Sequence, residues 1–522
     1  MSDTKKISLF SIISASSVGT MIEWYDFYIF GSLATIISTK FFPTGNPTAA
    51  FLSTLATFAA GFVVRPFGAL FFGRLGDLVG RKYTFMLTLL LMGGSTFLIG
   101  CIPGYETIGF LAPLLVLVLR LLQGLALGGE YGGAATYVAE HSPTEKRGYY
   151  TSWIQTTATA GLFISLLVIM ATRTVLDKDT FEDWGWRVPF WVSILMVLVS
   201  YLIRKNMHES PLFAKAKEEG KTSTNPIKES FGHKLNFKYV LLALFGAVMG
   251  QGVVWYTGQF YAMSFIEKVM MVDKNSVDSL MFIALIMGTP FFVFFGWLSD
   301  KVGRKWIMMA GLLVAILSYR PIYEKMYQTV NVKNKTELID KATAEVSVKQ
   351  LKGTAVDSIF TEKSYFSDGT VKTATLTKSF VDGTPLVVDG KNKEVKKTVI
   401  KINDSDKWTL IWLVFIQVIF VTMVYGPIAS FLVEMFPVKI RYTSMSLPYH
   451  IGNGVFGGLL PAVATYLATT AKDANEVATK AGATLPYAQP YLQGLWYPIV
   501  VASVCLVIGV IYLNGKDMRI DD

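Results

Sequence analysis

A duplicated loop motif constrains the fold of this chain more than any other feature. The sequence GRLGDLVGRKY at Gly73–Tyr83 returns as GWLSDKVGRKW at Gly296–Trp306, an offset of 223 residues. A second set of residues keeps its spacing at an offset of 294: Glu140, Pro143 and Arg147 recur as Glu434, Pro437 and Arg441. Each copy of the loop motif lies between two long apolar stretches, which predicts a duplicated membrane unit. The offsets differ by 71, so the second half carries about that much extra sequence between its two motifs.

Composition places the chain in a lipid bilayer. Apolar residues make up 52% and charged residues 16% of the 522 residues, whereas soluble proteins carry about 25% charged residues. The mean hydropathy is +0.43. Twelve apolar runs are long enough to cross a hydrocarbon core of about 30 Å; they lie near 9–39, 49–72, 84–102, 110–138, 149–172, 188–204, 238–266, 278–298, 306–323, 408–433, 442–469 and 491–514. The ninth run is short and is expected to end at Arg320-Pro321.

The lysines and arginines predict the orientation of the chain. With twelve spans, the basic residues of both loop motifs and of the segment 204–238 fall on one side of the membrane. Basic residues in short loops mark the cytoplasmic side, so that side and both chain ends are predicted to be cytoplasmic. We expect an integral multi-pass protein of the bacterial cytoplasmic (inner) membrane. The net charge of +10 mostly reflects this bias and does not indicate a nucleic-acid-binding surface.

Few residues are suited to metal, disulfide or covalent chemistry. The two cysteines, Cys101 and Cys505, lie in or near spans and do not form a disulfide framework. The four histidines lack metal-ligand spacing. We therefore expect no enzyme, metal or cofactor. The expected partners are the lipid bilayer, a small-molecule substrate and protons, without nucleic acid or an obligate protein partner.

The extra sequence of the second half forms an insertion at 321–407, which the twelve-span topology puts outside the cytoplasm. Residues 336–350 are expected to form a short helix. Residues 365–402 alternate polar and apolar positions around three Asp-Gly pairs, a β-hairpin signal: Asp368-Gly369, Asp382-Gly383 and Asp389-Gly390. We expect a small mixed or β-rich domain. The predicted division is an N-terminal six-helix bundle at 1–205, a cytoplasmic linker at 206–236 and a C-terminal bundle at 237–522 that contains the insertion.

Two six-span halves with the motif Gly-x-x-x-Asp-x-x-Gly-Arg-Lys after the second span of each resemble the major facilitator superfamily. Residues 19–28, 65–69 and 120–133 look like the metabolite:proton symporter family, whose members carry proline or betaine, α-ketoglutarate, citrate and shikimate. The long insertion departs from that family. The resemblance implies an all-α membrane protein with twelve transmembrane helices in two pseudo-symmetric halves, and a small soluble domain between helices 9 and 10.

The loop motifs carry charges that suit a gate. Asp77 and Asp300 are predicted at cytoplasmic helix ends, where a carboxylate can cap exposed backbone N–H groups of a neighbouring helix. Arginines in the same motifs can pair with nearby carboxylates. We predict that these groups latch the two halves in one conformation and release them in the other. The predicted gating residues are Asp77, Arg81, Glu140, Arg147, Asp300, Arg304, Glu434 and Arg441. The alternative is that they serve only membrane topology and helix capping.

Five charged residues lie within predicted spans: Glu23, Asp26, Arg65, Arg120 and Glu130. Each ionised group near the middle of the bilayer costs about 2.5–3.5 kcal/mol, so the set needs partners or a function. The positions related to them by the motif offsets carry no charge in the second half. The gates are therefore duplicated and the buried charges are not, which predicts that coupling chemistry is concentrated in the first half.

Three buried carboxylates against two buried arginines leave one carboxylate in excess. A desolvated carboxylate can carry a proton at neutral pH, so Glu23, Asp26 and Glu130 are predicted to couple transport to protons. Arg120, with Gln123 beside it, is predicted to hold a substrate carboxylate, and Arg65 to act as a counter-charge. Alternatively, the arginine of span two extends towards the cytoplasm and the carboxylate of span four is a structural partner of a neighbouring helix.

Uncharged polar and aromatic residues complete the predicted substrate site: Tyr25 and Tyr131 from the first half, and Trp255, Tyr256, Gln259, Tyr425 and Asn453 from the second. An aromatic pair such as Trp255 and Tyr256 could enclose a quaternary ammonium group, although such residues also serve as packing anchors.

Together these features predict a secondary active transporter. It would couple protons to the uptake of a small carboxylate or zwitterionic metabolite, such as proline, betaine or an organic acid, by alternating access. Proton-driven efflux and a transporter-like ligand sensor are the alternatives. The metabolite, the stoichiometry and the choice between H⁺ and Na⁺ stay open at this point.

Overall fold

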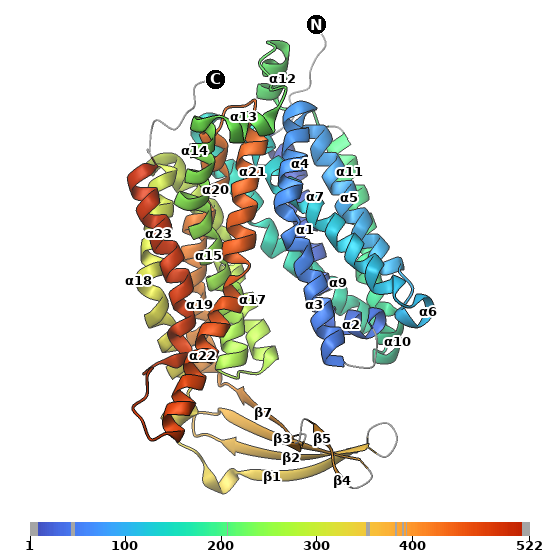
Figure 1. The fold of residues 1–522 in the computed structure, drawn as a ribbon, viewed down its shortest axis with the longest axis vertical. Coiled ribbons are helices and arrows are strands. Elements are labelled where there is room, and N and C mark those ends of the chain that lie inside the picture. Colours follow the sequence, from blue (N-terminus) through green and yellow to red (C-terminus); the bar gives the residue numbers. More distant parts are fainter. Residues whose placement is uncertain are drawn as a thin grey trace.

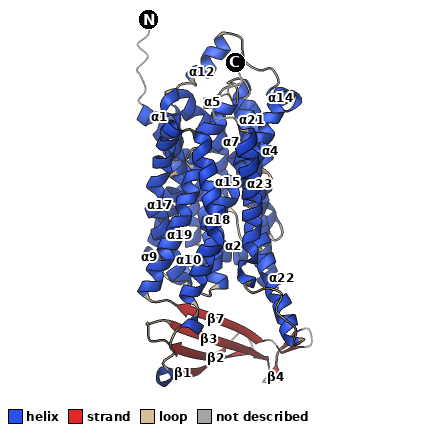
Figure 2. Cartoon of the chain, turned by 90° about the vertical axis from the view of Figure 1, so that its left-hand side faces the viewer, coloured by secondary structure: helices blue, strands red, loops and turns tan. Residues whose placement is uncertain are grey.

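The computed structural model describes residues 9–42, 47–205, 207–350, 355–381, 384–388, 391–392 and 394–513. Two groups of long helices stand side by side, and a small β-sheet lies at one end of the second group (Figure 1). Seen from the side, the helices run roughly parallel to one another and the sheet caps the bundle at one end only (Figure 2). We call this end the sheet end and the other the latch end.

The helical content agrees with twelve spans. Within the described residues, ten helical stretches are long and apolar enough to cross a membrane: 81–101, 111–141, 144–175, 185–205, 234–269, 274–302, 304–330, 404–435, 441–480 and 490–512. The first two expected spans are each broken once, at Leu33 and Val64. Large apolar side chains such as Phe67, Leu202 and Leu317 are more than 60% exposed on the outside, as expected for a surface that faces lipid.

The first half consists of α1 (Leu9–Ser32), α2 (Ala34–Phe41), α3 (Pro47–Val63), α4 (Arg65–Leu78), α5 (Arg81–Cys101), α7 (Leu111–His141), α8 (Arg147–Gln155), α9 (Thr157–Val175) and α11 (Val188–Lys205). The second consists of α14 (Lys234–Ala243), α15 (Met249–Tyr256), α17 (Lys274–Val302), α18 (Arg304–Val330), α19 (Asp404–Tyr425), α20 (Ile428–Met435), α21 (Arg441–Ile451), α22 (Leu460–Lys480) and α23 (Trp496–Tyr512). Three π-helical turns interrupt the span that contains α15, at Leu244–Val248, Thr257–Tyr261 and Phe265–Val269.

Glycines set the close approach of α4 and α7. A Cβ atom on Gly68 would overlap the backbone carbonyl of Leu125, and one on Gly128 would overlap the carbonyl of Arg65. Small residues let membrane helices pack backbone to backbone, so these two positions fix α4 against the helix that carries Arg120, Gln123 and Glu130.

The ninth span is longer than predicted. Helix α18 continues through Pro321 and ends at Val330, so the expectation that it ends at Arg320-Pro321 is wrong. Proline removes one backbone hydrogen bond from a helix, but Pro321 lies on the exposed face. The turns beyond it are held by buried side chains: the Tyr323 hydroxyl donates to the carbonyl of Thr257 at 2.8 Å. Tertiary packing therefore outweighs the proline.

The inserted domain is an antiparallel sheet of β1 (Thr343–Gln350), β2 (Ala355–Tyr365), β3 (Val371–Val381) and β7 (Glu394–Lys401), with short β4 (Thr384–Pro385) also paired to β3. The short helix expected at 336–350 is wrong: residues 343–350 form β1, where the β-branched residues Thr343, Val346 and Val348 favour a strand. The hairpin expected at Asp368-Gly369 is present between β2 and β3, and Gly369 has a φ of +87°. The pairs Asp382-Gly383 and Asp389-Gly390 lie outside the described residues.

The sheet is attached to the bundle at one corner. Ile400 of β7 donates its N–H to the carbonyl of Met271 at 2.7 Å and accepts from the N–H of Asp273 at 3.0 Å. The ammonium group of Lys335 contacts the carboxylates of Asp368 at 2.5 Å and of Asp406. Burial raises the pKa of Asp368, but the hydrogen bonds from Lys335 and Thr370 and the charge of Lys335 together outweigh it and hold that pKa below its usual range.

Replacing residues 336–402 by a short Gly/Ser linker should leave a folded bundle. The chain leaves and rejoins the helices at nearly the same place, because Lys335 contacts Asp406 at the start of α19, and β1 is exposed along its whole length. We expect a monodisperse peak in detergent and a yield comparable to the parent. Aggregation of the shortened chain, while the same linker inserted at 382–383 is tolerated, would show that the sheet is integral to the fold.

Candidate functional site

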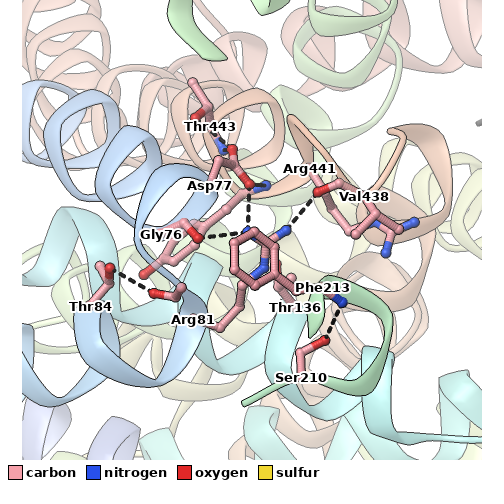
Figure 3. A network of polar contacts seen from close by, with 12 residues as sticks. Gly76, Asp77, Arg81, Thr84, Thr136, Ser210, Phe213, Val438, Arg441 and Thr443 are labelled. Atoms are coloured by element: carbon pink, nitrogen blue, oxygen red, sulfur yellow. Dashed lines mark hydrogen bonds and ion pairs between the residues drawn. The ribbon is translucent and has the colours of Figure 1, made fainter. Parts of the chain in front are cut away.

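The latch end is closed by a carboxylate that joins the two halves. Asp77, in the last turn of α4, accepts hydrogen bonds from the backbone N–H groups of Tyr442 and Thr443 at 3.3 and 2.8 Å, and from the Thr443 hydroxyl at 2.7 Å. These residues begin α21, in the other half. The Arg81 guanidinium lies 2.9 Å from Asp77. Figure 3 shows how these side chains converge. The helix capping predicted for Asp77 is therefore present.

Arg81 and Glu140 extend this contact. The Arg81 guanidinium donates to the backbone carbonyl of Val438 at 2.6 Å and lies 3.5 Å from the Glu140 carboxylate, which accepts from Arg441 at 2.9 Å. Arg81 and Glu140 are in the first half, whereas Val438 and Arg441 are in the second. An ionic network without exposed carboxylates thus ties the halves together.

The second copy of the motif makes an equivalent contact with the roles of the two halves exchanged. Asp300, in the last turn of α17, accepts from the N–H groups of Gly148 and Tyr149 of α8, both at 2.8 Å. These two residues precede Tyr442 and Thr443 by the same 294 positions seen in the sequence. Each half therefore caps a helix of the other with the aspartate of its loop motif. We call the two contacts the Asp77 latch and the Asp300 latch.

The partners of the Asp300 latch repeat those of the Asp77 latch. Arg304 contacts Asp300 at 2.8 Å and Glu434 through two hydrogen bonds of 2.7 Å, and Arg147 lies 4.0 Å from Glu434. The ion pairs predicted for the two motif arginines are therefore observed. The Asp300 latch is more exposed, since the Glu434 side chain is 29% accessible whereas that of Glu140 is inaccessible.

The linker between the halves explains the difference. Its helix α12 (Pro211–Glu218) places the Phe213 ring 4.3 Å from the Arg81 guanidinium (Figure 3). Glu209 accepts from the backbone N–H of Arg81 at 3.0 Å, and the Ser210 hydroxyl donates to Glu140. The linker therefore shields the Asp77 latch from solvent, whereas the side chains of Arg304 and Glu434 in the Asp300 latch stay 10% and 29% accessible.

Inside the first half, Glu130 is held by a buried arginine that the sequence did not single out. Its two oxygens accept from Arg204 and from the Thr88 hydroxyl, each at 2.7 Å. Arg204 also donates to the carbonyl of Phe85 at 2.6 Å and stacks over its ring at 3.4 Å. Both charged side chains are about 1% exposed.

This pair corrects the charge count. Arg204 is the last residue but one of α11 and belongs to the basic segment that the sequence predicts at the membrane surface, but it is fully buried. Three buried carboxylates therefore face three arginines, and the expected single excess carboxylate is wrong. A long side chain near a helix end can turn inward when a buried carboxylate lies on a neighbouring helix, as Glu130 does here. In the sequence, Arg204 stands next to Lys205 at the end of an apolar run, which is the pattern of a surface charge.

A hydrogen-bonded chain links Asp26 to Arg120 across three helices. Asp26 of α1 accepts from the Thr96 hydroxyl of α5 at 2.6 Å. Thr96 accepts from the side-chain amide of Gln123 at 2.5 Å, and Gln123 accepts from Arg120 at 2.8 Å, both on α7. The guanidinium also lies 4.4 Å from the Phe30 ring centre. A carboxylate and a guanidinium are thus connected without touching.

Glu23 and Arg65 lie closer to the interface between the halves. Glu23 interacts electrostatically with Arg65, Asp26 and Glu130, and Arg65 rests 4.2 Å from the Phe62 ring centre. Glu23 also lines a small cavity of about 10 Å³, roughly the room one water needs. The cavity is walled by both halves: Thr20, Glu23, Trp24, Tyr131, Ile154, Gln155 and Thr157 from the first, and Tyr425 and Tyr449 from the second.

Aromatic rings close this cavity from both sides. Tyr131 stacks on Tyr449 with ring centres 3.7 Å apart, and the Tyr425 and Tyr449 hydroxyls are 2.6 Å apart. Trp24 meets Trp255 across the interface at 5.3 Å. Of the predicted substrate residues, the structure therefore brings together Tyr131, Trp255, Tyr256 and Tyr425.

Other predicted substrate residues are engaged elsewhere. The Tyr25 hydroxyl donates to the carbonyl of Pro189 at 2.6 Å inside the apolar core of the first half, so Tyr25 does not face the cavity and we drop it from the site. Asn453 exchanges two hydrogen bonds of 3.1 Å with Gln251 within the second half. Gln259 is half-buried in a π-helical turn.

Sequence reasoning missed Thr96, Arg204, Gln155 and Trp24. Thr96 carries no signal, because a threonine in an apolar helix more often bonds its own backbone. Gln155 carries the same signal as Gln123, a glutamine within a predicted span. Trp24 belongs to the segment that supports the family resemblance, next to Glu23, and its contact with Trp255 places it on the side of α1 that faces the second half.

Comparisons with known proteins agree with this architecture. Residues 12–339 match the family described as "Sugar (and other) transporter". The proline/betaine transporter of Escherichia coli (strain K12) is 34% identical over 319 residues, 60% of this chain and 63% of that transporter. The citrate-proton symporter of Klebsiella pneumoniae is 35% identical over 305 residues, 58% of this chain and 67% of that symporter. The match thus spans less than two thirds of the proline/betaine transporter.

The fold is also that of a solved structure. The proton:xylose symporter XylE of the major facilitator superfamily, bound to 6-bromo-6-deoxy-D-glucose, superposes with a TM-score of 0.63 over 98% of this chain and 97% of XylE. The two share 15% of their residues, so this likeness concerns the fold alone.

Proposed function

We propose that this chain, which belongs to the sugar (and other) transporter family of the major facilitator superfamily, takes up a small carboxylate or zwitterionic metabolite together with protons. As a member of that family it is an integral, multi-pass membrane transporter and not an enzyme. The relatives named above support the choice of proline, betaine or an organic acid as substrate.

One arrangement carries the proposal. The connected set of Asp26, Thr96, Gln123 and Arg120 lies in one half. Asp26 is three residues along α1 from Glu23, which lines a cavity whose walls come from both halves. A carboxylate that exchanges a proton and a guanidinium that holds a substrate carboxylate would then respond to each other. In this proposal Glu130 is the structural partner of Arg204 and does not carry the proton, which leaves Glu23 and Asp26 as the proton-carrying acids.

The two latches support alternating access. They join the halves at the latch end through charged and capping contacts. Beside these contacts the Tyr442 ring packs closely against Gly76 and Gly132 of the first half, so opening has to separate both. We propose that they hold the carrier closed on the cytoplasmic side and open when the substrate site has filled. The latch end, with both chain ends, would face the cytoplasm, and the sheet would face the space outside the bacterial inner membrane.

Uptake and exchange measured side by side test the proposal. Purified protein in liposomes would receive radiolabelled proline, glycine betaine, α-ketoglutarate or citrate, with and without an inward proton gradient. We expect gradient-driven accumulation of at least one probe, which a protonophore abolishes. Glu23→Gln or Asp26→Asn should lose accumulation while keeping counterflow exchange, which needs no net proton movement.

Each alternative gives a different result. Accumulation that requires the opposite gradient would indicate efflux, and saturable binding of a probe without any exchange would indicate a sensor. If Glu23→Gln, Asp26→Asn and Glu130→Gln all accumulate the probe like the parent, the proton site lies elsewhere.

A further inference from the structure

The chain of hydrogen bonds between Asp26 and Arg120 passes through a residue with no charge. Thr96 sits at the crossing of three helices, and its side chain, like those of Asp26 and Gln123, is almost completely buried. Buried polar groups of this kind keep their partners because no water replaces a lost hydrogen bond. The four side chains of this hydrogen-bonded row therefore hold one another in place.

The direction of each bond follows from the donors available. A guanidinium only donates and an ionised carboxylate only accepts. Arg120 must donate to the Gln123 oxygen, so the Gln123 amide nitrogen faces Thr96 and donates to its oxygen. The single proton of the Thr96 hydroxyl is left for Asp26, at 2.6 Å. Every bond in the chain thus points from the cation to the anion.

A change at one end changes the other. When Asp26 takes up a proton, the carboxyl loses the charge that favours donation from Thr96. The carbonyl of Met92, 3.0 Å from the Thr96 hydroxyl, is an alternative acceptor in the same helix turn. The protonated carboxyl can then donate to the Thr96 oxygen, where it competes with the Gln123 amide nitrogen for the same acceptor. Gln123 thereby loses its fixed orientation and its hold on Arg120 weakens, which makes the guanidinium available to a substrate carboxylate.

Few other charges bear on Asp26. Glu23 lies on the same helix and Arg120 on α7. The Arg204 side chain of α11 is bound to Glu130. Helix α9 carries only Arg173, in its last turn, and α5 and α8 carry charged residues only in their first turns. The charged group linked to Asp26 through α5 is therefore Arg120.

We propose that Thr96 is a positioning residue that transmits the protonation state of Asp26 to Arg120 through Gln123. This inference rests on the proposed function, because it explains how a proton on Asp26 raises the affinity of Arg120 for the substrate. Coupling between two sites typically amounts to a 5- to 150-fold change in affinity. Thr96 provides that coupling without touching the substrate.

The test compares Thr96→Val, which keeps the shape and removes the hydroxyl, with Thr96→Ser, which keeps the hydroxyl. Ser95→Ala is the matched control, because the Ser95 hydroxyl bonds only the backbone of its own helix, at 2.7 Å. The apparent KM for counterflow of the transported probe is measured at several pH values. We expect the parent, Thr96→Ser and Ser95→Ala to show a KM that varies about 5-fold or more with pH, and Thr96→Val to exchange the probe with a flat KM. A Thr96→Val carrier with the parental pH dependence would overturn the proposal.

A second measurement does not depend on transport. The infrared carbonyl band of protonated Asp26, identified by its loss in Asp26→Asn, is followed as a function of pH in detergent. Its midpoint should move in Thr96→Val and also in Gln123→Leu, although Gln123 does not touch Asp26, and stay in Ser95→Ala. A midpoint that does not move in Gln123→Leu overturns the relay even where transport is confirmed. Absence of any gradient-driven uptake, with the midpoint shifts present, would instead overturn the proposed function and keep the relay.

Discussion

Replacing Arg204 by methionine should strongly reduce the amount of folded protein. The substitution leaves the Glu130 carboxylate buried without its cation, and removing one partner of a buried ion pair costs about 3–5 kcal/mol. The cost is compounded by the loss of the hydrogen bond from Arg204 to the Phe85 carbonyl. The measurement is the yield of monodisperse protein in detergent and its melting temperature, compared with the parent.

The double variant Glu130→Gln/Arg204→Met is the control. It removes both charges, so it should regain most of the stability lost by Arg204→Met, because a buried pair replaced as a whole is often neutral. Arg187→Met serves as the comparison for an arginine near the sheet end, since Arg187 bonds only the carbonyls of Gly100 and Ile102 and no carboxylate. If the double variant is no more stable than Arg204→Met, the unpaired Glu130 carboxylate is not the cause of the lost stability. Glu130 would then no longer be the structural partner of Arg204 and would again be a candidate for the proton-carrying acid.

The sequence predicted the latches well because duplication is visible without a structure. Two copies of one motif at one offset place Asp77 and Asp300 at equivalent helix ends, and the second offset places the helix starts that they cap. The contacts of these residues with Thr443 and Gly148 follow from symmetry together with the preference of a helix start for a carboxylate. The covering of one latch by Phe213 was not predictable, since a short amphipathic linker helix fits many surfaces.

The buried charges were predicted as individuals and not as a network. A carboxylate within an apolar run is visible in the sequence, but its partner is visible only when it too interrupts such a run. Arg204 ends its run, and Thr96 does not interrupt one. Arg204 is nevertheless the hydrogen-bond partner of Glu130, and Thr96 is that of Asp26. The ninth span was mispredicted for the same reason, because a tertiary contact is not visible in the sequence. Local preference ends the helix at Pro321, but the contact of Tyr323 with the neighbouring helix stabilises the turns of α18 beyond it.

Arg120→Lys should abolish most uptake although the positive charge is kept. A guanidinium can hold a carboxylate through two parallel N–H···O bonds, whereas an ammonium group is a single point of charge. A hydrogen bond to a charged group contributes about 1.5–3 kcal/mol, so the loss of one such bond lowers kcat/KM about 10- to 100-fold, since 1.4 kcal/mol corresponds to tenfold.

The same measurement on Arg65→Lys separates an anchor from a counter-charge. Arg65 lies near Glu23, over the Phe62 ring, and in our proposal it supplies charge without binding the substrate, so lysine should preserve most of its effect. Uptake and counterflow are measured for both variants in liposomes with matched protein content, after the melting temperature has shown that each is folded. Equal losses in Arg120→Lys and Arg65→Lys would mean that both arginines hold the substrate. An Arg120→Lys carrier with parental kcat/KM would mean that the substrate carboxylate is bound elsewhere. The reason is that a lysine at this position is shorter and has a single ammonium group, so it cannot form the two parallel hydrogen bonds that Arg120 offers.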